Sequence, residues 1–92
     1  MINLNKKRRT IITIIAISLF KLGLSVINSV IEELKNIPQI KKIMSLTGDY
    51  DVLTEIEVET PEELFDIFAN KIDLIQGISS SNTHMVMRAW QK

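Results

Sequence analysis

Apolar positions along the chain alternate between the period of a strand and that of a helix. Residues 10–18 are mostly β-branched Ile and Thr, which favour a strand because branched side chains pack well on a pleated surface. Apolar residues then recur every three or four positions over 23–35, which predicts a helix with one buried face. Pro38 follows and marks the end of this helix.

Residues 40–58 predict a β-hairpin. Segments 40–47 and 50–58 have the composition of strands, and Gly48 with Asp49 provides the turn between them. The second strand alternates strictly, so its two faces differ in polarity. One face carries Tyr50, Val52, Thr54, Ile56 and Val58, and the other carries Asp51, Leu53, Glu55 and Glu57.

A second helix is predicted to begin at Pro61, on the clearest local signal in the chain. Thr60 is a typical N-cap, Pro61 occupies the first helical position, and Glu63 lies three residues after the cap. Gly77 ends the helical pattern, and residues 81–90 supply a fourth strand. The predicted order of elements is βαββαβ.

The two halves of the chain repeat one plan. Residues 37–40 (Ile-Pro-Gln-Ile) follow the first helix, and residues 75–78 (Ile-Gln-Gly-Ile) follow the second, about 38 positions later. Two such units with right-handed crossovers place the first and third strands at the centre of a four-stranded antiparallel sheet. Both helices then lie on one face. The predicted class is α+β with a ferredoxin-like arrangement.

The first strand is apolar on both sides, although the helices cover only one face of the predicted sheet. Burying roughly seven uncovered apolar side chains at ~1.5 kcal/mol each would supply ~10 kcal/mol as an upper estimate, which rivals the stability of a whole domain. We therefore expect a homodimer that packs sheet against sheet. The residues assigned to this face are Ile11, Ile15, Ile17, Ile43 and Leu53, with one or two of Val86, Met87 and Trp90.

Composition agrees with one folded domain and argues against an enzyme. The 92 residues are 46% hydrophobic and 24% charged, as in globular chains. There is no cysteine, which excludes disulfides and thiol chemistry and makes the cytoplasm the expected compartment. His84 is the single histidine, and the sequence has no phosphate-binding glycine motif. We expect no catalytic residues, no metal site and no cofactor.

A net charge of zero conceals an asymmetry between the two halves. Residues 1–42 carry eight Lys or Arg and two Glu, whereas residues 43–92 carry nine acids and three bases. Half of the first group lies in residues 6–9, so residues 1–9 are interpreted as a basic tail ahead of a domain over 10–92. Contact of this tail with nucleic acid is the alternative.

The start of the chain also has features of a signal peptide. A basic run precedes the apolar stretch 10–20, and residues 16–18 (Ala-Ile-Ser) fit a small-x-small cleavage site. This stretch is shorter than the roughly 20 apolar residues that span a bilayer, so no membrane helix is expected. Its β-branched composition favours the strand.

The candidate ligand-binding residues lie in two polar segments at equivalent places in the two halves. A turn requires Gly and Asp, but the adjacent Tyr50 and Asp51 add a phenol and a second carboxylate. Carboxylates suit the ammonium group of an amino acid, and exposed backbone amides of the turn suit its carboxylate. Residues 79–83 provide hydroxyl and amide groups. Both segments are also compatible with ordinary turns and loops. The predicted site is Gly48, Asp49, Tyr50, Asp51, Ser81 and Thr83.

Three segments resemble the RAM domain, the effector-binding domain of the Lrp/AsnC family, over roughly residues 10–88. They are residues 37–40, residues 47–51, and Ile78, Ser81 and Thr83 before the last strand. The resemblance implies dimers joined face to face through their sheets, further assembly into rings, and amino acids bound at interfaces near the hairpin turn.

The resemblance also carries expectations about the role of the chain. Full-length family members carry a helix-turn-helix domain ahead of this one, and only nine residues precede the predicted first strand here, so we expect a stand-alone domain without direct DNA binding. The expected function is a non-enzymatic amino-acid-sensing and oligomerisation module that regulates transcription or amino-acid metabolism through partners, with full-length relatives as candidate partners. The alternatives are a purely structural assembly module with a vestigial pocket, and a small dimeric ferredoxin-like enzyme.

Overall fold

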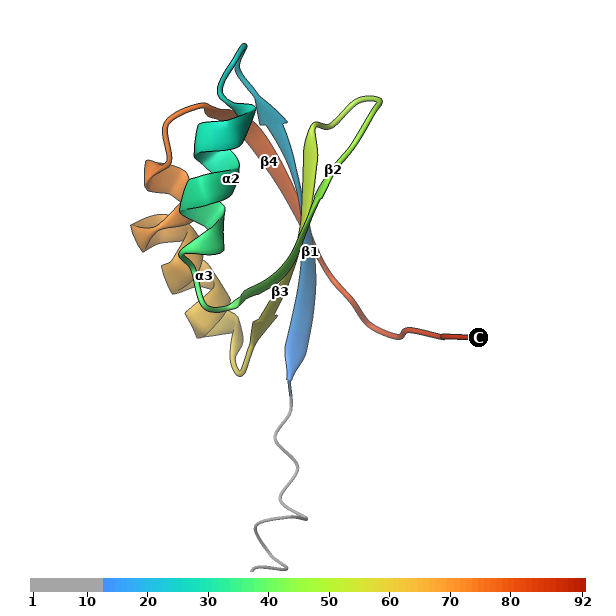
Figure 1. Ribbon diagram of the computed structural model, residues 1–92. Coiled ribbons are helices and arrows are strands. Elements are labelled where there is room, and N and C mark those ends of the chain that lie inside the picture. The colour runs from blue at the N-terminus through green and yellow to red at the C-terminus, as the bar shows by residue number, and fades with distance from the viewer. Residues whose placement is uncertain (1–12) are drawn as a thin grey trace, which may run out of the picture.

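The computed structural model describes residues 13–92, which form a four-stranded antiparallel sheet with two helices on one side (Figure 1). The strands lie in the order β2-β3-β1-β4, so β1 and β3 are central and the predicted ferredoxin-like βαββαβ fold is confirmed. The elements are β1 (Ile14–Leu22), α2 (Ile27–Lys35), β2 (Ile40–Ser45), β3 (Val52–Val58), α3 (Pro61–Asn70), the 3-10 turn η1 (Ile72–Leu74) and β4 (Ile78–Met85).

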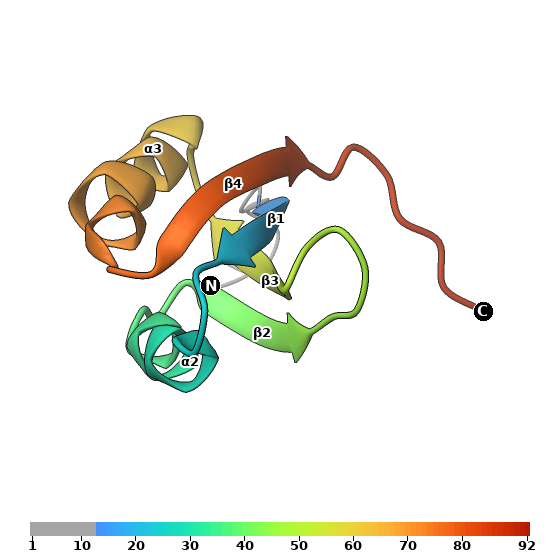
Figure 2. The same cartoon turned by 90° about the horizontal axis from the view of Figure 1, so that it is seen from above.

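The core lies between the sheet and the helix layer. Figure 2 shows α2 and α3 on the same side of the sheet, opposite the end of the chain. Alternate residues of the central strands point into this layer, as the predicted period of two requires. The ring centroids of Phe20 and Phe68 are 6.4 Å apart and join β1 to α3. The buried strand residues are Ala16, Ser18 and Phe20 of β1 and Val52, Thr54, Ile56 and Val58 of β3.

Strand boundaries differ from the prediction at both ends of the domain. The first strand continues to Leu22 instead of ending at Ser18, because Lys21 points to the exposed side of the sheet, where a charged residue is tolerated. The fourth strand covers Ile78–Met85 rather than 81–90. Its serines suit a strand at the sheet edge, where side chains remain exposed. Predicted strand residues 10–12 and the basic tail lie outside the described residues.

The first helix begins at Ile27, four residues later than predicted. The backbone of Ser25 has a φ of +63°, which is not helical, and Gly23 donates its N–H to the carbonyl oxygen of Gly77 at 2.8 Å. These contacts hold the segment as a loop against the start of β4. The prediction from the three- to four-residue spacing of apolar positions therefore began the helix one turn too early.

Helix α3 begins where the sequence predicts. Thr60 Oγ1 accepts a hydrogen bond from the N–H of Glu63 at 3.0 Å, and Pro61 occupies the first helical position. Glu63 Oε1 in turn accepts from the N–H of Glu59 at 2.9 Å. The reciprocal arrangement resembles a capping box and fixes the direction of the helix as it leaves β3.

The side of the sheet away from the helices is called the open face. Ile15, Ile17 and Leu19 of β1 alternate with buried residues and so project onto this face, as Leu53 of β3 does. Ile43 was assigned here from the sequence, and that was wrong. It pairs with Thr54 on the helix side and packs against the core cluster, because a bulge between Ile40 and Lys42 shifts the alternation of β2.

The two helices are short. Neither α2 nor α3, nor any other helix in residues 13–92, is long and apolar enough to cross a membrane.

Candidate functional site

The β2–β3 turn is anchored to the end of β1. Leu46 donates its N–H to the carbonyl oxygen of Asp51 at 2.9 Å. Asp51 in turn donates its N–H to the carbonyl oxygen of Phe20 at 2.9 Å. At the tip, Gly48 has a φ of +108° and an added Cβ would meet no atom within 4 Å, so the turn projects into open space. Gly48 and the exposed Asp49 are therefore accessible to a ligand or a second chain.

Asp51 has a structural role in this arrangement. Its Oδ2 accepts a hydrogen bond from the N–H of Leu22 at 2.8 Å, next to the bulge at which β1 leaves its register with β4. A carboxylate that accepts from a backbone N–H forms one of the stronger hydrogen bonds in proteins. Replacing Asp51 would thus disturb the fold as well as the binding of any ligand, so a substitution at Asp51 is a poor test of binding.

Tyr50 lies at the centre of a polar cluster that links three strands or turns. Lys21 Nζ of β1 lies 5.5 Å from the centroid of the Tyr50 ring, within the range of a cation–π contact. Asn82 Nδ2 of β4 donates to Tyr50 Oη at 3.2 Å. Lys21, Tyr50 and Asn82 are called the tyrosine cluster below, and they bring an ammonium, a phenol and an amide to the hairpin end of the open face.

Lys21 is absent from the predicted site, and Asn82 was named among the polar residues 79–83 but not included in the six predicted ligand residues. Lys21 lies beyond the predicted first strand, which ends at Ser18, although a lysine that interrupts an apolar segment is itself a signal of an exposed strand position. Alternation along β4 was the available signal, since it places Asn82 on the opposite side of the strand from both neighbours.

Ser81 and Thr83 lie on the helix side of the sheet. They pair with Phe20 and Ser18, and directly opposed residues in antiparallel strands share a face. Thr83 Oγ1 and Ser18 Oγ are 2.8 Å apart and hydrogen-bonded. The structure therefore brings Tyr50 together with Asn82 and separates it from Ser81 and Thr83, which stay predicted ligand residues.

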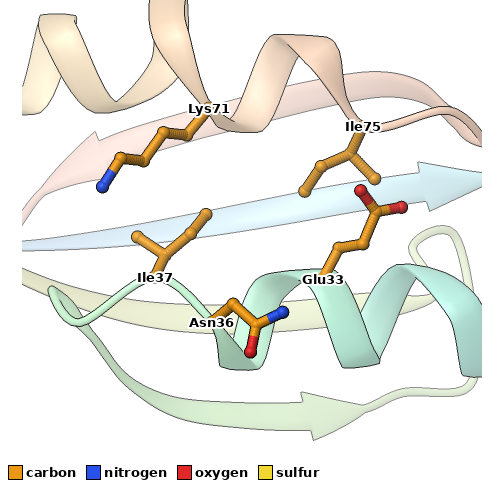
Figure 3. A pocket seen from close by; sticks show the side chains of 5 residues that line it. All are labelled: Glu33, Asn36, Ile37, Lys71 and Ile75. Carbon is orange, nitrogen blue, oxygen red and sulfur yellow. The ribbon is translucent and has the colours of Figure 1, made fainter.

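A second concave region lies between the two helices, on the opposite side of the sheet. It has a volume of about 240 Å³ and is lined by a residue of α2 and by residues of the segments that follow α2 and α3. In the view of Figure 3, Lys71 and Ile37 lie toward one end of this cavity, and Ile75 and Glu33 lie toward the other. None of the predicted site residues lines it.

The tyrosine cluster can recognise a small zwitterion. An ammonium group pairs with a carboxylate, and the exposed carboxylate of Asp49 near the turn can pair with an amine. Within residues 13–92 no group of three His, Asp or Glu side chains could hold a metal ion.

The βαββαβ order, the single helix layer and the polar cluster at the hairpin define a ferredoxin-like domain with a candidate small-molecule site. The family model described as the Lrp/AsnC ligand binding domain matches residues 13–92. The chain belongs to this family, as its resemblance to the RAM domain predicts.

Two curated relatives match in sequence. One is the homocitrate synthase of Sulfurisphaera tokodaii, 38% identical over 60 residues, which cover 65% of this chain and 13% of the enzyme. The other is the HTH-type transcriptional regulator FL11 of Pyrococcus furiosus, 29% identical over 75 residues, which cover 82% of this chain and 49% of the regulator. The matched region is thus less than half of either relative.

Solved structures share the fold. AsnC of E. coli superposes with a TM-score of 0.80 at 19% identity, over 97% of this chain and 60% of that one. A transcriptional regulator from Neisseria meningitidis, in complex with L-Met, superposes with a TM-score of 0.76 at 11% identity, over 100% of this chain and 60% of that one. At these identities the likeness establishes the architecture alone.

Proposed function

We propose that this chain is a non-enzymatic effector-binding module that takes an amino acid at the tyrosine cluster and acts through partners. The observation that carries the proposal is the contact of Tyr50 with both Lys21 and Asn82 at the hairpin end of the open face. Gly48, Asp49 and Asp51 line the same end of the sheet. Membership of the Lrp/AsnC ligand binding domain family supports a ligand-binding role.

An amino acid is the ligand class that fits both the site and the neighbours. Lys21 offers a cation to the α-carboxylate, and Asp49 offers an anion to the α-amino group. The Neisseria regulator of the same fold is in complex with L-Met, which supports this class for the present chain.

We also propose that the site lies at the border of a dimer formed through the open face. Ile15, Ile17, Leu19 and Leu53 form an apolar centre on this face that the helices leave uncovered. Lys42 of β2 lies opposite Glu55 of β3 in the strand register, so charged residues adjoin that centre on the β2 side. A second copy would cover the apolar centre and narrow the solvent access to the tyrosine cluster.

The cellular effect of such a module depends on the protein to which it is fused or binds. Its relatives include part of a transcriptional regulator and a small part of a biosynthetic enzyme, which supports one sensing domain serving different partners. Full-length family members are the candidate partners in transcription, and an enzyme is the candidate partner in amino-acid metabolism. In each case the ligand would alter the assembly of the domain rather than a chemical step.

A thermal-shift screen with each of the twenty amino acids tests the proposal. A ligand that binds only the folded state raises its stability by about 2.7 kcal/mol at one hundred times its Kd, so at least one amino acid is expected to raise Tm by several degrees. Lys21→Met is expected to remove this rise, because the partner of the α-carboxylate is gone.

Lys71→Met is the matched control, because it removes a lysine from the cavity between the helices and leaves the tyrosine cluster intact. It is expected to keep the full rise in Tm. A rise in Tm that persists in Lys21→Met but is lost in Lys71→Met would place the ligand in the cavity between the helices, and would contradict binding at the tyrosine cluster. No rise with any amino acid, on a chain confirmed to be folded, would contradict the proposal.

A further inference from the structure

An apolar groove runs along the outer edge of the sheet between α3 and β4. It has a volume of about 300 Å³ and its walls are almost entirely apolar. Phe65 is 72% exposed and Met85 is 49% exposed, so two large apolar side chains stand open to solvent here. The α3–β4 groove is lined by Pro61, Leu64, Phe65, Phe68, Thr83 and Met85.

The strand beside this groove is suited to accept another strand. β4 is at one edge of the sheet, with β1 on its inner side. An edge strand presents backbone N–H and C=O groups outward, and extended peptides bind such edges by adding a strand. The groove therefore offers backbone partners and an apolar pocket together.

The segment after β4 carries Met87 and Trp90 among polar and cationic residues, and it leaves the body of the domain. Val86 donates its N–H to the carbonyl oxygen of Ile15 at 2.8 Å, and residues 87–92 then extend away from the sheet on the side opposite the helices (Figures 1 and 2). Met87 is 93% exposed and Trp90 is 83% exposed. Residues 86–92 are called the arm.

We propose that the arm docks in the α3–β4 groove of a second copy of this chain, with Trp90 as its anchor. The arm departs on the open-face side, whereas its own groove lies on the helix side of the sheet, so the path leads toward a partner. When extended, the four residue steps from Val86 to Trp90 span about 13 Å, which crosses the roughly 10 Å between two stacked sheets and brings Trp90 to the edge of the partner's sheet, beside which the groove lies. Tryptophan in an apolar pocket is a typical anchor of protein interfaces.

The placement of the second copy rests on the open-face dimer proposed above, but the docking is independent of effector binding. A two-fold symmetric dimer would contain two arms and two grooves, so each chain would both give and receive an arm. The exchange would add β4-edge backbone pairing and indole burial to the contact between the sheets. It would also tie the dimer to the last residues of the chain.

Trp90 is the only tryptophan, so its fluorescence reports directly on the arm. In the full-length chain, emission is expected to shift to shorter wavelength as concentration rises and light scattering shows the mass of two chains. Phe65→Asp is expected to abolish the shift and to weaken self-association by at least about tenfold, since it places a charge in the groove. Leu74→Asp is the control, because Leu74 is 70% exposed but lies outside the groove.

Mixing two variants distinguishes a partner's groove from the chain's own. The Trp90→Phe chain has an intact groove and no tryptophan. The Phe65→Asp chain keeps Trp90 but has a disrupted groove. Each alone is expected to lack a shifted tryptophan signal, and the mixture is expected to regain it. Failure to regain it would overturn the exchange, as would a dimer whose Trp90 emits like an exposed indole. Neither result would affect the amino-acid screen with Lys21→Met.

Discussion

Replacing Gly77 with alanine is expected to lower the free energy of unfolding by about 2–4 kcal/mol. Gly77 has a φ of +105°, where side-chain-bearing residues are strained, and an added Cβ would lie 2.8 Å from Val26 Cγ2 and 3.1 Å from Val30 Cγ2. Both contacts are with branched side chains at the start of α2, which have little room to move. Urea denaturation monitored by circular dichroism measures the loss.

Gly48→Ala provides the matched control for that substitution. Gly48 has nearly the same φ, +108°, but an added Cβ there would meet nothing within 4 Å. It should therefore show the backbone strain without the clash, a loss of about 1–2 kcal/mol. Equal losses at the two positions would mean that the packing of Gly77 against α2 contributes nothing to stability.

Replacing Ile17 with lysine is expected to convert the proposed open-face dimer into a monomer while leaving the fold intact. Ile17 lies in the central strand, on the open face, and pairs across the sheet with Glu55. In one chain a lysine there gains an acidic neighbour, but in a sheet-to-sheet dimer it would place two charges in the apolar centre. We expect at least a thousandfold weaker association, about 4 kcal/mol, measured by light scattering across a dilution series.

Leu74→Lys is the control for the loss of the dimer, since it adds the same charge to an exposed leucine of η1 on the helix side. Its mass should remain that of two chains. A wild-type chain that scatters as a monomer at the highest soluble concentration would contradict the open-face dimer. An unchanged dimer in Ile17→Lys would show that the chains associate through another surface.

The fold followed from local signals that agree with one another. Thr60 and Pro61 fixed the start of α3, and the alternation of Val52 to Val58 fixed the buried face of β3. The first strand was predicted over 10–18 and the last over 81–90, whereas they cover Ile14–Leu22 and Ile78–Met85, with Lys21 and serines inside them. Polar residues are tolerated on an exposed face of a sheet or in an edge strand. Only the pairing of strands shows which face is exposed and which strands are at the edge.

The candidate site was harder to predict because it depends on contacts between distant segments. The turn residues Gly48 and Tyr50 could be found from composition, but the partners of Tyr50 come from the far end of β1 and from β4. The bulge in β2 that turned Ile43 inward has no composition signal of its own. Asp51 was predicted as a ligand residue because of its charge. Its hydrogen bond to the N–H of Leu22 could not be predicted, because it depends on how the end of β1 lies beside the start of β3.

The most direct test of the proposed function is a nuclear magnetic resonance titration of the uniformly ¹⁵N-labelled chain with the amino acid that raises Tm most. We expect the largest chemical-shift changes at the backbone amides of Gly48, Asp49 and Tyr50 and at the side-chain amide of Asn82. Saturating changes confined to Asn36 and Lys71 would place the ligand between the helices instead. Such a result, or no change anywhere, would contradict an effector site at the tyrosine cluster.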